Sequence, residues 1–454
     1  MAGHRSKRQI PGAVISVVTG AMFQWRLLII IHMTVRMPSS FMPEIPARFV
    51  YQQQTTTLRA RKIRLGFALL FGHRPKPSAQ LVDQFARAYM QADTIGDAVA
   101  EELFVQRKPA QGMALLTQGL EHGAASLSDA DGQCQTPALS RLLSKAEQQP
   151  DWLDEAKLAR ACETIHRCGR HAMYALGDLA LLGGYANSDI AKPLAFTGAL
   201  NGNSSFDRVS ETTSFWFDVT TPGGLAVHSK GYNSAIKVRV MHALVRRRLL
   251  QHPDWNSAEW GLPINQGDAL ATNVAFSMLM ILGCKMLGWR FDDDDIEAIL
   301  HLWRYTGYLM GDNYRLLPET RQQGVDWLYM VAVSARINPD KDSLELASSY
   351  LQAFRDVPGS TVYKTFVYWL HRVYSGFFLP GDIRKALQLP TTFGLKLLPL
   401  LQAPVVYSLD WLSRRWPVLD QRLRRFGRAG QAYIVSSRLQ GRDVEFQDKP
   451  TLTR

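Results

Sequence analysis

The sequence predicts an all-α, globular fold of many helices. Apolar residues recur with the 3.6-residue period of a helix along most of the chain, while few stretches alternate with the period of a strand. Hydrophobic residues make up 46% and charged residues 20% of the 454 positions, a balance typical of a globular protein with a deep core. A chain of this length is long enough for two or three domains, and no internal repeat is visible.

The first 42 residues are expected to form a basic and apolar N-terminal tail. A basic start over Arg5–Arg8 precedes an apolar run over 10–23, which is the layout of a signal peptide. A Gln-Trp-Arg interruption follows, so the segment is not a clean membrane-spanning helix. Three interpretations stay open: a membrane-touching or disordered tail, a cleaved signal, or a start codon placed too far upstream of Met37 or Met42.

Residues 43–150 are expected to form an N-terminal helical region. Between 78 and 121 the apolar residues keep the helical period. Residues 122–150 are richer in Gly, Ser, Asp and Gln, which predicts a loop or a weak boundary.

Residues 151–385 predict a second, larger helical domain. A helix is expected from Trp152 to about Leu182, where Gly183 and Gly184 stop it. Residues 274–287 are almost continuously apolar but too short to span a bilayer, which indicates a buried core helix. The acids Asp292–Asp295 lack the spacing of a calcium loop and fit the start of a helix instead.

The last segment, 386–454, predicts short helices broken by prolines and rich in arginine. Apolar runs over 395–401 and 405–412 adjoin an arginine cluster over 414–428. We prefer packing of this segment onto the core, and peripheral contact with a membrane is the alternative.

A formal net charge of +12 is typical of proteins that bind nucleic acid. The basic residues gather at the two ends of the chain and no nucleic-acid motif is present, so an anionic membrane surface is the better electrostatic partner. Four cysteines form no disulfide framework at this length, which favours a reducing, cytoplasmic location. Membrane association is a further expectation, because apolar runs adjoin the basic clusters. A zinc site is disfavoured, because helical geometry turns Cys162 and His166 away from Cys168 and His171.

His242 is the leading candidate for a functional residue. On a helix, Arg239 lies three residues before it and Arg246 four residues after it, so all three share roughly one face. An imidazole can bind a metal, and guanidinium groups can hold carboxylates. Haem offers both an iron atom and two propionates. An ordinary core histidine is the alternative.

A second candidate group precedes it. Arg208 and Thr212 lie four residues apart on one helical face, with Phe215, Trp216 and Phe217 close behind. A cation and a hydroxyl beside aromatic surface could hold dioxygen above an iron. The start of an ordinary amphipathic helix is the alternative.

Six short motifs occur in a fixed order between residues 170 and 385. This ordered set resembles the family of rubber oxygenases (latex clearing protein) and MpaB-type oxygenases. The motifs are Thr-Gly-x-Leu at 197–200, Arg-x-x-x-Thr at 208–212, Val-Arg-x-x-His-x-x-Val-Arg at 238–246, Gly-x-Pro-Ile-Asn-Gln at 261–266, Thr-x-x-x-Phe at 272–276 and Trp-Arg-x-x-Gly-x-x-x-Gly at 303–311.

The resemblance implies a helical fold around a buried haem b pocket. His242 matches the proximal ligand of the iron, with Arg239 and Arg246 as further candidates for binding the cofactor. Arg208 and Thr212 match polar groups on the distal side. This chain has Glu211 where rubber oxygenases have a lysine, and a carboxylate there is a candidate base or proton relay.

The family also uses a glutamate upstream of the arginine. Asp189 is the only carboxylate in the corresponding stretch, 187–193. The resemblance therefore implies that the haem site is retained while the substrate chemistry differs.

The leading hypothesis is a haem b-dependent oxygenase that uses dioxygen on an apolar, unsaturated substrate, terpenoid, lipid-like or polyisoprenoid-like. Oxidative cleavage of a carbon–carbon double bond is what the resemblance suggests. The alternatives are a non-catalytic haem- or lipid-binding protein at a membrane surface and a helical scaffold with a dead site. A di-iron protein is disfavoured, because only Glu163-x-x-His166 matches the required motif.

Overall fold

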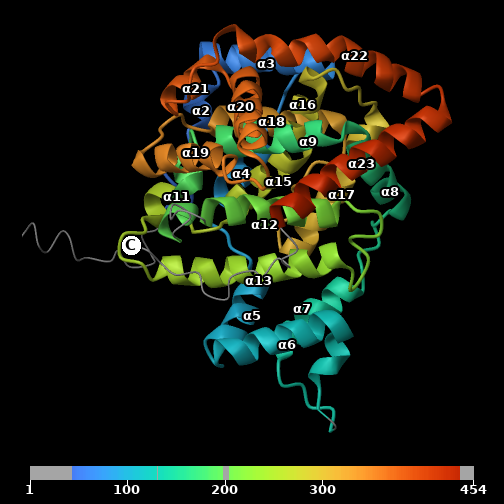
Figure 1. Cartoon of the computed structure of the whole chain (residues 1–454). Helices are drawn as coiled ribbons and strands as arrows, with labels where there is room; N and C mark the ends of the chain where they lie inside the picture. The colour runs from blue at the N-terminus through green and yellow to red at the C-terminus, as the bar shows by residue number, and fades with distance from the viewer. Residues whose placement is uncertain (1–42, 130, 198–203, 440–454) are drawn as a thin grey trace, which may run out of the picture. The chain divides into compact units, whose positions relative to one another are not determined.

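The computed structural model describes residues 43–129, 131–197 and 204–439. The N-terminal tail expected over 1–42 and part of the Thr-Gly-x-Leu motif lie outside these residues. The described chain is helical and forms no strand, apart from one isolated β-bridge between Ser128 and Cys134. The predicted all-α fold class is confirmed (Figure 1).

The helices follow one another with short connections. In chain order they are α2 (Tyr51–Gln54), α3 (Leu58–Phe71), α4 (Ala79–Ala88), α5 (Thr94–Phe104), α6 (Pro109–His122), η2 (Ala124–Leu127), α7 (Pro137–Glu147), α8 (Glu155–Cys168), α9 (Arg170–Tyr174), η3 (Ala175–Leu181), α10 (Leu182–Gly184), α11 (Ser188–Phe196), α12 (Ser204–Val219), α13 (Lys230–Leu250), α14 (Ser257–Trp260), α15 (Gln266–Val274), η4 (Ala275–Leu279), α16 (Met280–Met286), α17 (Asp293–Met310), α18 (Arg321–Ser334), α19 (Lys341–Ala353), α20 (Thr361–Phe378), α21 (Gly381–Ala386), η5 (Phe393–Leu397), α22 (Leu398–Ser413) and α23 (Pro417–Leu439).

From Ile45 onward the chain forms one compact unit. Its centre is the continuous helical run of α15, η4 and α16, which packs against η3, α17 and α18. Side chains along this run are fully buried at Val274, Met278, Ile281 and Cys284, as expected for a core helix. The run from Gln266 to Met286 is long and apolar enough to cross a membrane, but most of it is buried inside the protein.

Two parts of this core have π-helical geometry, η3 and η4, and they pack against each other. The backbones approach closely here, since a Cβ atom on Gly283 would lie 2.5 Å from the Cβ of Ala175. Widened turns of this kind are rare in helices and occur frequently at functional sites.

The helix that carries His242 runs through the lower part of the molecule in Figure 1. It is α13, with α12 packed on one side and α5 on the other, and it also contacts α17. The site residues predicted from the sequence therefore lie on two neighbouring helices.

Two predicted elements differ from the structure. The helix expected from Trp152 to Leu182 is broken at Gly169, whose φ of +53° ends α8. Helix α23 crosses at this break, where a side chain on Gly427 would clash with the His166 carbonyl. The break lets two distant segments approach, a tertiary demand that the local helical period does not reveal.

The loop expected over 122–150 was also incorrect in part, because it contains α7. Pro137 is the first residue of this helix, a position that proline favours. Leu139, Leu142 and Leu143 then form a buried stripe. Because the surrounding residues are polar, composition alone did not predict this short amphipathic helix.

The C-terminal segment packs onto the core. Helix α23 lies along α8, and the Gln431 amide donates hydrogen bonds to the carbonyls of Ile165 and Gly169 at 3.3 and 3.0 Å. The Asp292–Asp295 run starts α17 as expected, with Asp292 as its N-cap and Asp295 completing a capping box.

Candidate functional site

The His242 side chain on α13 is half-buried. Burial lowers the pKa of His242 to about 4, and Arg246 acts in the same direction while Asp93 opposes it. The ring is therefore neutral at pH 7. Within the described part of the chain it has no hydrogen-bond partner, so its lone pair is available to a metal.

The two arginines that flank His242 are engaged with α5. Arg239 binds Asp93 through two parallel hydrogen bonds, from Nε at 2.6 Å and from an Nη at 2.8 Å. Arg246 donates to Asp97 at 2.8 Å and to the Ile264 carbonyl at 2.8 Å. These contacts, which we call the α5–α13 clamp, give both arginines a structural role.

Asp93 and Asp97 owe their place to the start of α5. Asp93 is the N-cap residue and Asp97 lies in the first turn, where negative charge is favoured. Both residues precede the part of the sequence that carries the motifs, and sequence reasoning did not select them. The sequence shows two acidic residues at a helix start, a pattern too common to predict that they pair with the arginines of another helix.

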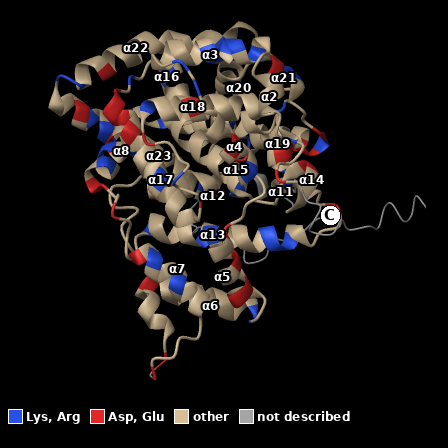
Figure 2. Cartoon of the chain, turned by 180° about the vertical axis from the view of Figure 1, so that it is seen from behind, with Lys and Arg blue, Asp and Glu red and all other residues tan. Residues whose placement is uncertain are grey.

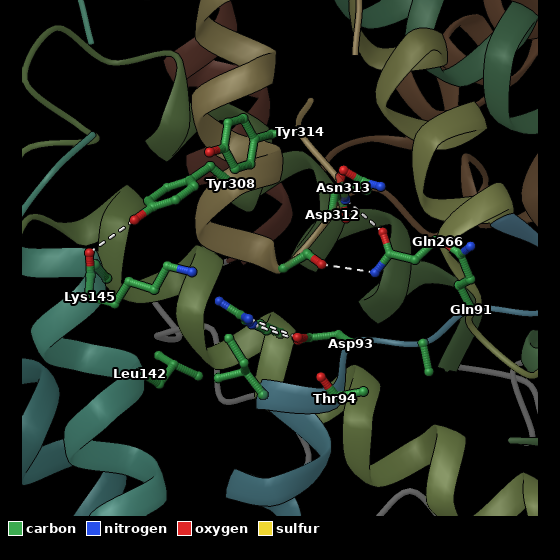
Figure 3. Close-up of a pocket in the computed structure, with 15 residues that line it drawn as sticks. Gln91, Asp93, Thr94, Leu142, Lys145, Gln266, Tyr308, Asp312, Asn313 and Tyr314 are labelled. Atoms are coloured by element: carbon green, nitrogen blue, oxygen red, sulfur yellow. Dashed lines mark hydrogen bonds and ion pairs between the residues drawn. The ribbon is translucent and has the colours of Figure 1, made fainter. Parts of the chain in front are cut away.

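A polar cavity of about 230 Å³ opens beside the clamp (Figure 3). Helix α13 contributes Arg239 to its lining, and Asp93, Gln266 and Asp312 contribute from other elements. Gln266 also lines the cavity. Its side chain donates to the Gly311 carbonyl at 2.9 Å and accepts from the backbone N–H of Asn313 at 2.7 Å. The cavity is smaller than the roughly 300–1,000 Å³ of typical ligand pockets, and His242 does not line it, so it is not a haem pocket.

Asp312 is the titratable group of special interest in this cavity. Burial raises its pKa to about 7, with Asp93 acting in the same direction while a hydrogen bond with Asn273 and the charge of Arg239 oppose the shift. This carboxyl group can therefore hold or release a proton near neutral pH.

The second group of predicted residues lies on α12. Arg208 donates to the Thr197 hydroxyl at 3.2 Å and to the Thr197 carbonyl at 3.4 Å. Burial lowers the pKa of Arg208, against the charges of Glu211 and Tyr185. Glu211 is half-buried and Thr212 is exposed. Since α12 packs on α13, the structure brings the helices of Arg208 and His242 together.

Asp189, the carboxylate upstream of Arg208, is engaged elsewhere. Its side chain accepts two hydrogen bonds from Arg336, at 3.0 and 2.8 Å, and Arg336 also binds Glu259. Asp189 therefore joins α11 to the segment after α18, and the structure does not show it next to Arg208.

Thr272 of the Thr-x-x-x-Phe motif stands out on the core helix α15. Its side chain is exposed, although the adjacent Ala271 and Asn273 are buried. One turn later, Phe276 is half-buried and stacks on Trp303 with ring centroids 4.6 Å apart. Thr272 is thus an accessible hydroxyl on an otherwise largely buried helix.

Over the described ranges, no group of three or more His, Cys, Asp or Glu side chains is placed to hold a metal ion. A site in which a single imidazole binds the iron of a haem requires no such group.

Comparisons with known proteins agree with the fold. Residues 166–403, just over half of the chain, match the family described as "ER-bound oxygenase mpaB/B'/Rubber oxygenase, catalytic domain". A rubber oxygenase from Streptomyces sp. (strain K30) is 27% identical over 187 residues, which are 40% of this chain. That match spans 45% of the length of the Streptomyces protein.

A solved structure described as "Structure of Latex Clearing Protein LCP in the closed state" is also similar. It has a TM-score of 0.58 and 21% sequence identity, over 75% of this chain and 91% of that chain. At this identity the similarity shows a common fold.

Proposed function

Because this chain belongs to the family of the mpaB and rubber oxygenase catalytic domain, we propose that it is a haem b-dependent oxygenase in which His242 would bind the iron. Bound haem would supply the redox chemistry that activates dioxygen. The substrate we propose is apolar and unsaturated, a terpenoid, a lipid or a polyisoprenoid, and its oxidation would cleave a carbon–carbon double bond.

The observation that supports this proposal most directly is that the His242 imidazole is neutral and has no hydrogen-bond partner among the described residues. A ligand of iron must be neutral and must offer a free lone pair, and this imidazole meets both conditions. It also lies within the long helix α13, whose backbone holds it in place.

We propose that residues of α12, which packs on α13, supply further polar groups to the site. The Arg208 guanidinium is held by Thr197, and the exposed Thr212 hydroxyl can hydrogen-bond a small polar ligand. Glu211, which replaces the lysine of rubber oxygenases, is proposed to move a proton between solvent and substrate.

The residues present offer a ligand for the iron of a haem more readily than they offer partners for its propionates. Arg239 and Arg246 are already paired with Asp93 and Asp97 inside the clamp. We propose that these two arginines hold α13, and thereby His242, rather than the cofactor itself.

Replacing His242 tests the assignment. We expect His242→Ala, purified after expression with haem supply, to lose the Soret band and to retain under a tenth of the wild-type haem. His122→Ala is the matched control, because His122 is an exposed histidine at the end of α6 and should leave haem content unchanged. Circular dichroism would verify that both variants are folded.

Added imidazole gives this experiment a second readout. Free imidazole should occupy the space left in His242→Ala and restore haem binding with a shifted Soret band. A His242→Ala protein with full haem content and an unchanged spectrum would remove His242 as the ligand.

The alternative of a non-catalytic haem- or lipid-binding protein is favoured by Glu211, since this departure falls at the proposed distal site. Oxygen consumption separates the two. The oxygenase consumes dioxygen in proportion to an added unsaturated terpenoid or lipid, whereas the binding protein does not.

A further inference from the structure

Helices α3 and α22 lie along the same end of the molecule, at the top of both Figure 1 and Figure 2. Both turn large apolar side chains outward. We call this surface the α3–α22 face; it comprises the exposed residues Leu58, Arg61, Lys62, Leu65, Leu69, Phe393, Leu395, Leu397, Leu400, Leu401 and Val405.

The outer side of α3 combines leucine with positive charge. Leu58 and Leu69 are 72% and 76% exposed, while Phe67 and Phe71 on the opposite side are buried. Positions 58, 62, 65 and 69 are three or four residues apart, so Lys62 lies in one stripe with the exposed leucines.

The orientation of α22 is fixed from its buried side. Asp410 is fully buried and accepts hydrogen bonds from Arg290 and Arg414, each at 3.1 Å. This anchor turns the opposite side of the helix outward, with Leu401 73% exposed. Phe393, in η5 just before α22, is 83% exposed.

The charges on this face are of one sign. The segments 58–71 and 391–409 contain no Asp or Glu, and the only acid of α22 is the buried Asp410. Arg61 and Lys62 are exposed on α3, and Figure 2 shows basic residues of α3 at this edge. Exposed leucines interleaved with Lys and Arg are typical of surfaces that lie in the headgroup region of an anionic bilayer.

Exposed aromatic residues border the face at the end of α22. Trp411 and Trp416 are both exposed, and Arg415 lies over the Trp411 ring at 3.5 Å from its centroid. Tryptophan is favoured at the boundary between lipid and water, because its ring is apolar and its N–H is polar.

We propose that the α3–α22 face docks this protein on the surface of an anionic lipid bilayer. Its apolar side chains would enter the headgroup layer, and Arg61 and Lys62 would attract the lipid phosphates. A second copy of the chain is the poorer occupant, because two such faces would bring like charges together. This proposal is independent of the haem assignment.

Sedimentation with vesicles tests the docking. The full chain should bind vesicles of phosphatidylcholine mixed with phosphatidylglycerol, and should bind pure phosphatidylcholine at least tenfold more weakly. Binding should weaken as salt is raised, because salt screens the contact with the headgroups.

Substitutions then locate the surface. We expect Leu65→Glu/Leu69→Glu to lower the partition coefficient at least tenfold, and Arg61→Glu/Lys62→Glu to abolish the preference for anionic lipid. Val105→Glu and Leu250→Glu are matched controls, since both replace exposed apolar residues away from this face and should bind as wild type. Haem content, measured on every variant, should stay unchanged.

Several outcomes would overturn the proposal. The full chain could stay in the supernatant with both vesicle types. The Leu65→Glu/Leu69→Glu variant could bind like the wild type, which would assign binding to another part of the chain. A concentration-dependent dimer that this variant abolishes would instead make the face a contact between two copies.

Discussion

At the scale of single residues, Asp312 and His242 show burial acting in opposite directions on two groups near the same helix. Burial raises the pKa of the Asp312 carboxyl to about 7 and lowers that of the His242 imidazole to about 4. Both shifts favour the neutral form, because an enclosed site stabilises charge less well than water does.

The Asp312 shift predicts a pH-dependent stability. Unfolded chains release this proton near pH 4 and the folded protein near pH 7, so the contribution of Asp312 to stability is lost as pH rises through this window. An asparagine side chain at this position would not titrate. We therefore expect Asp312→Asn to match the wild type at pH 4 and to be more stable by a few kcal/mol at pH 8, since one pKa unit corresponds to about 1.4 kcal/mol.

Denaturant unfolding at several pH values measures this difference. Asp131→Asn is the control, because it makes the same chemical change at an exposed loop residue. A constant difference between Asp312→Asn and wild type from pH 4 to pH 8 would contradict the prediction.

At the scale of elements, the α5–α13 clamp fixes the helix that carries His242. Its members are separated by well over a hundred residues in the sequence, Asp93 from Arg239 and Asp97 from Arg246. The Arg239–Asp93 pair is largely buried, with side-chain exposures of 11% and 10%, whereas Asp97 of the second pair is 39% exposed. Loss of one partner from such a pair leaves an uncompensated charge.

We expect Arg239→Met to lower the free energy of unfolding by about 3 kcal/mol, because Asp93 would remain buried and unpaired. Adding Asp93→Asn should recover part of the loss. Arg247→Met is the matched control on the same two helices, where the Arg247–Glu101 pair is exposed and contributes less than about 1 kcal/mol.

Haem content distinguishes the two roles considered for Arg239. If the clamp is structural, the folded fraction of Arg239→Met binds as much haem as the wild type. A stable variant with weakened haem binding would instead assign Arg239 to the propionates.

At the scale of the whole molecule, buried ion pairs join the arginine-rich C-terminal segment to the core. Asp410 is the centre of this network, with Arg290 and Arg414 at 3.1 Å and Arg167 of α8 at 3.6 Å. Arg414 continues the network to Asp295, at the start of α17. Arg414, the first residue of the arginine cluster over 414–428, is thus paired inside the fold.

Asp410→Asn removes the charge that these arginines share. We expect a loss of about 3 kcal/mol in unfolding free energy and faster trypsin cleavage at the arginines over 414–428, because the anchor of this segment is weakened. Asp382→Asn is the control, since Asp382 forms an exposed pair with Arg59 at 3.9 Å. Equal cleavage patterns for Asp410→Asn and wild type would contradict this role of the network.

Local patterns allowed several features to be predicted from the sequence. The helical period gave the all-α class, the buried run over 274–287 and the acid-capped start of α17. The ordered motifs gave the family and placed Arg208 and His242 on two helices. These features depend on residues close together in the chain, which is why they can be read without a structure.

Other features were decided by the tertiary structure alone. The break at Gly169, the engagement of Arg239 and Arg246 by the α5 acids, and the exposure of Thr212 all depend on contacts between distant segments. The sequence offered Arg239 and Arg246 both a haem and a structural role, and only the position of α5 shows which carboxylates they contact. The sequence thus determined most helices and the candidate ligand. The packing of distant helices decided which charged residues pair, because a buried charge is costly unless it is paired and the fold alone sets which partner lies within reach.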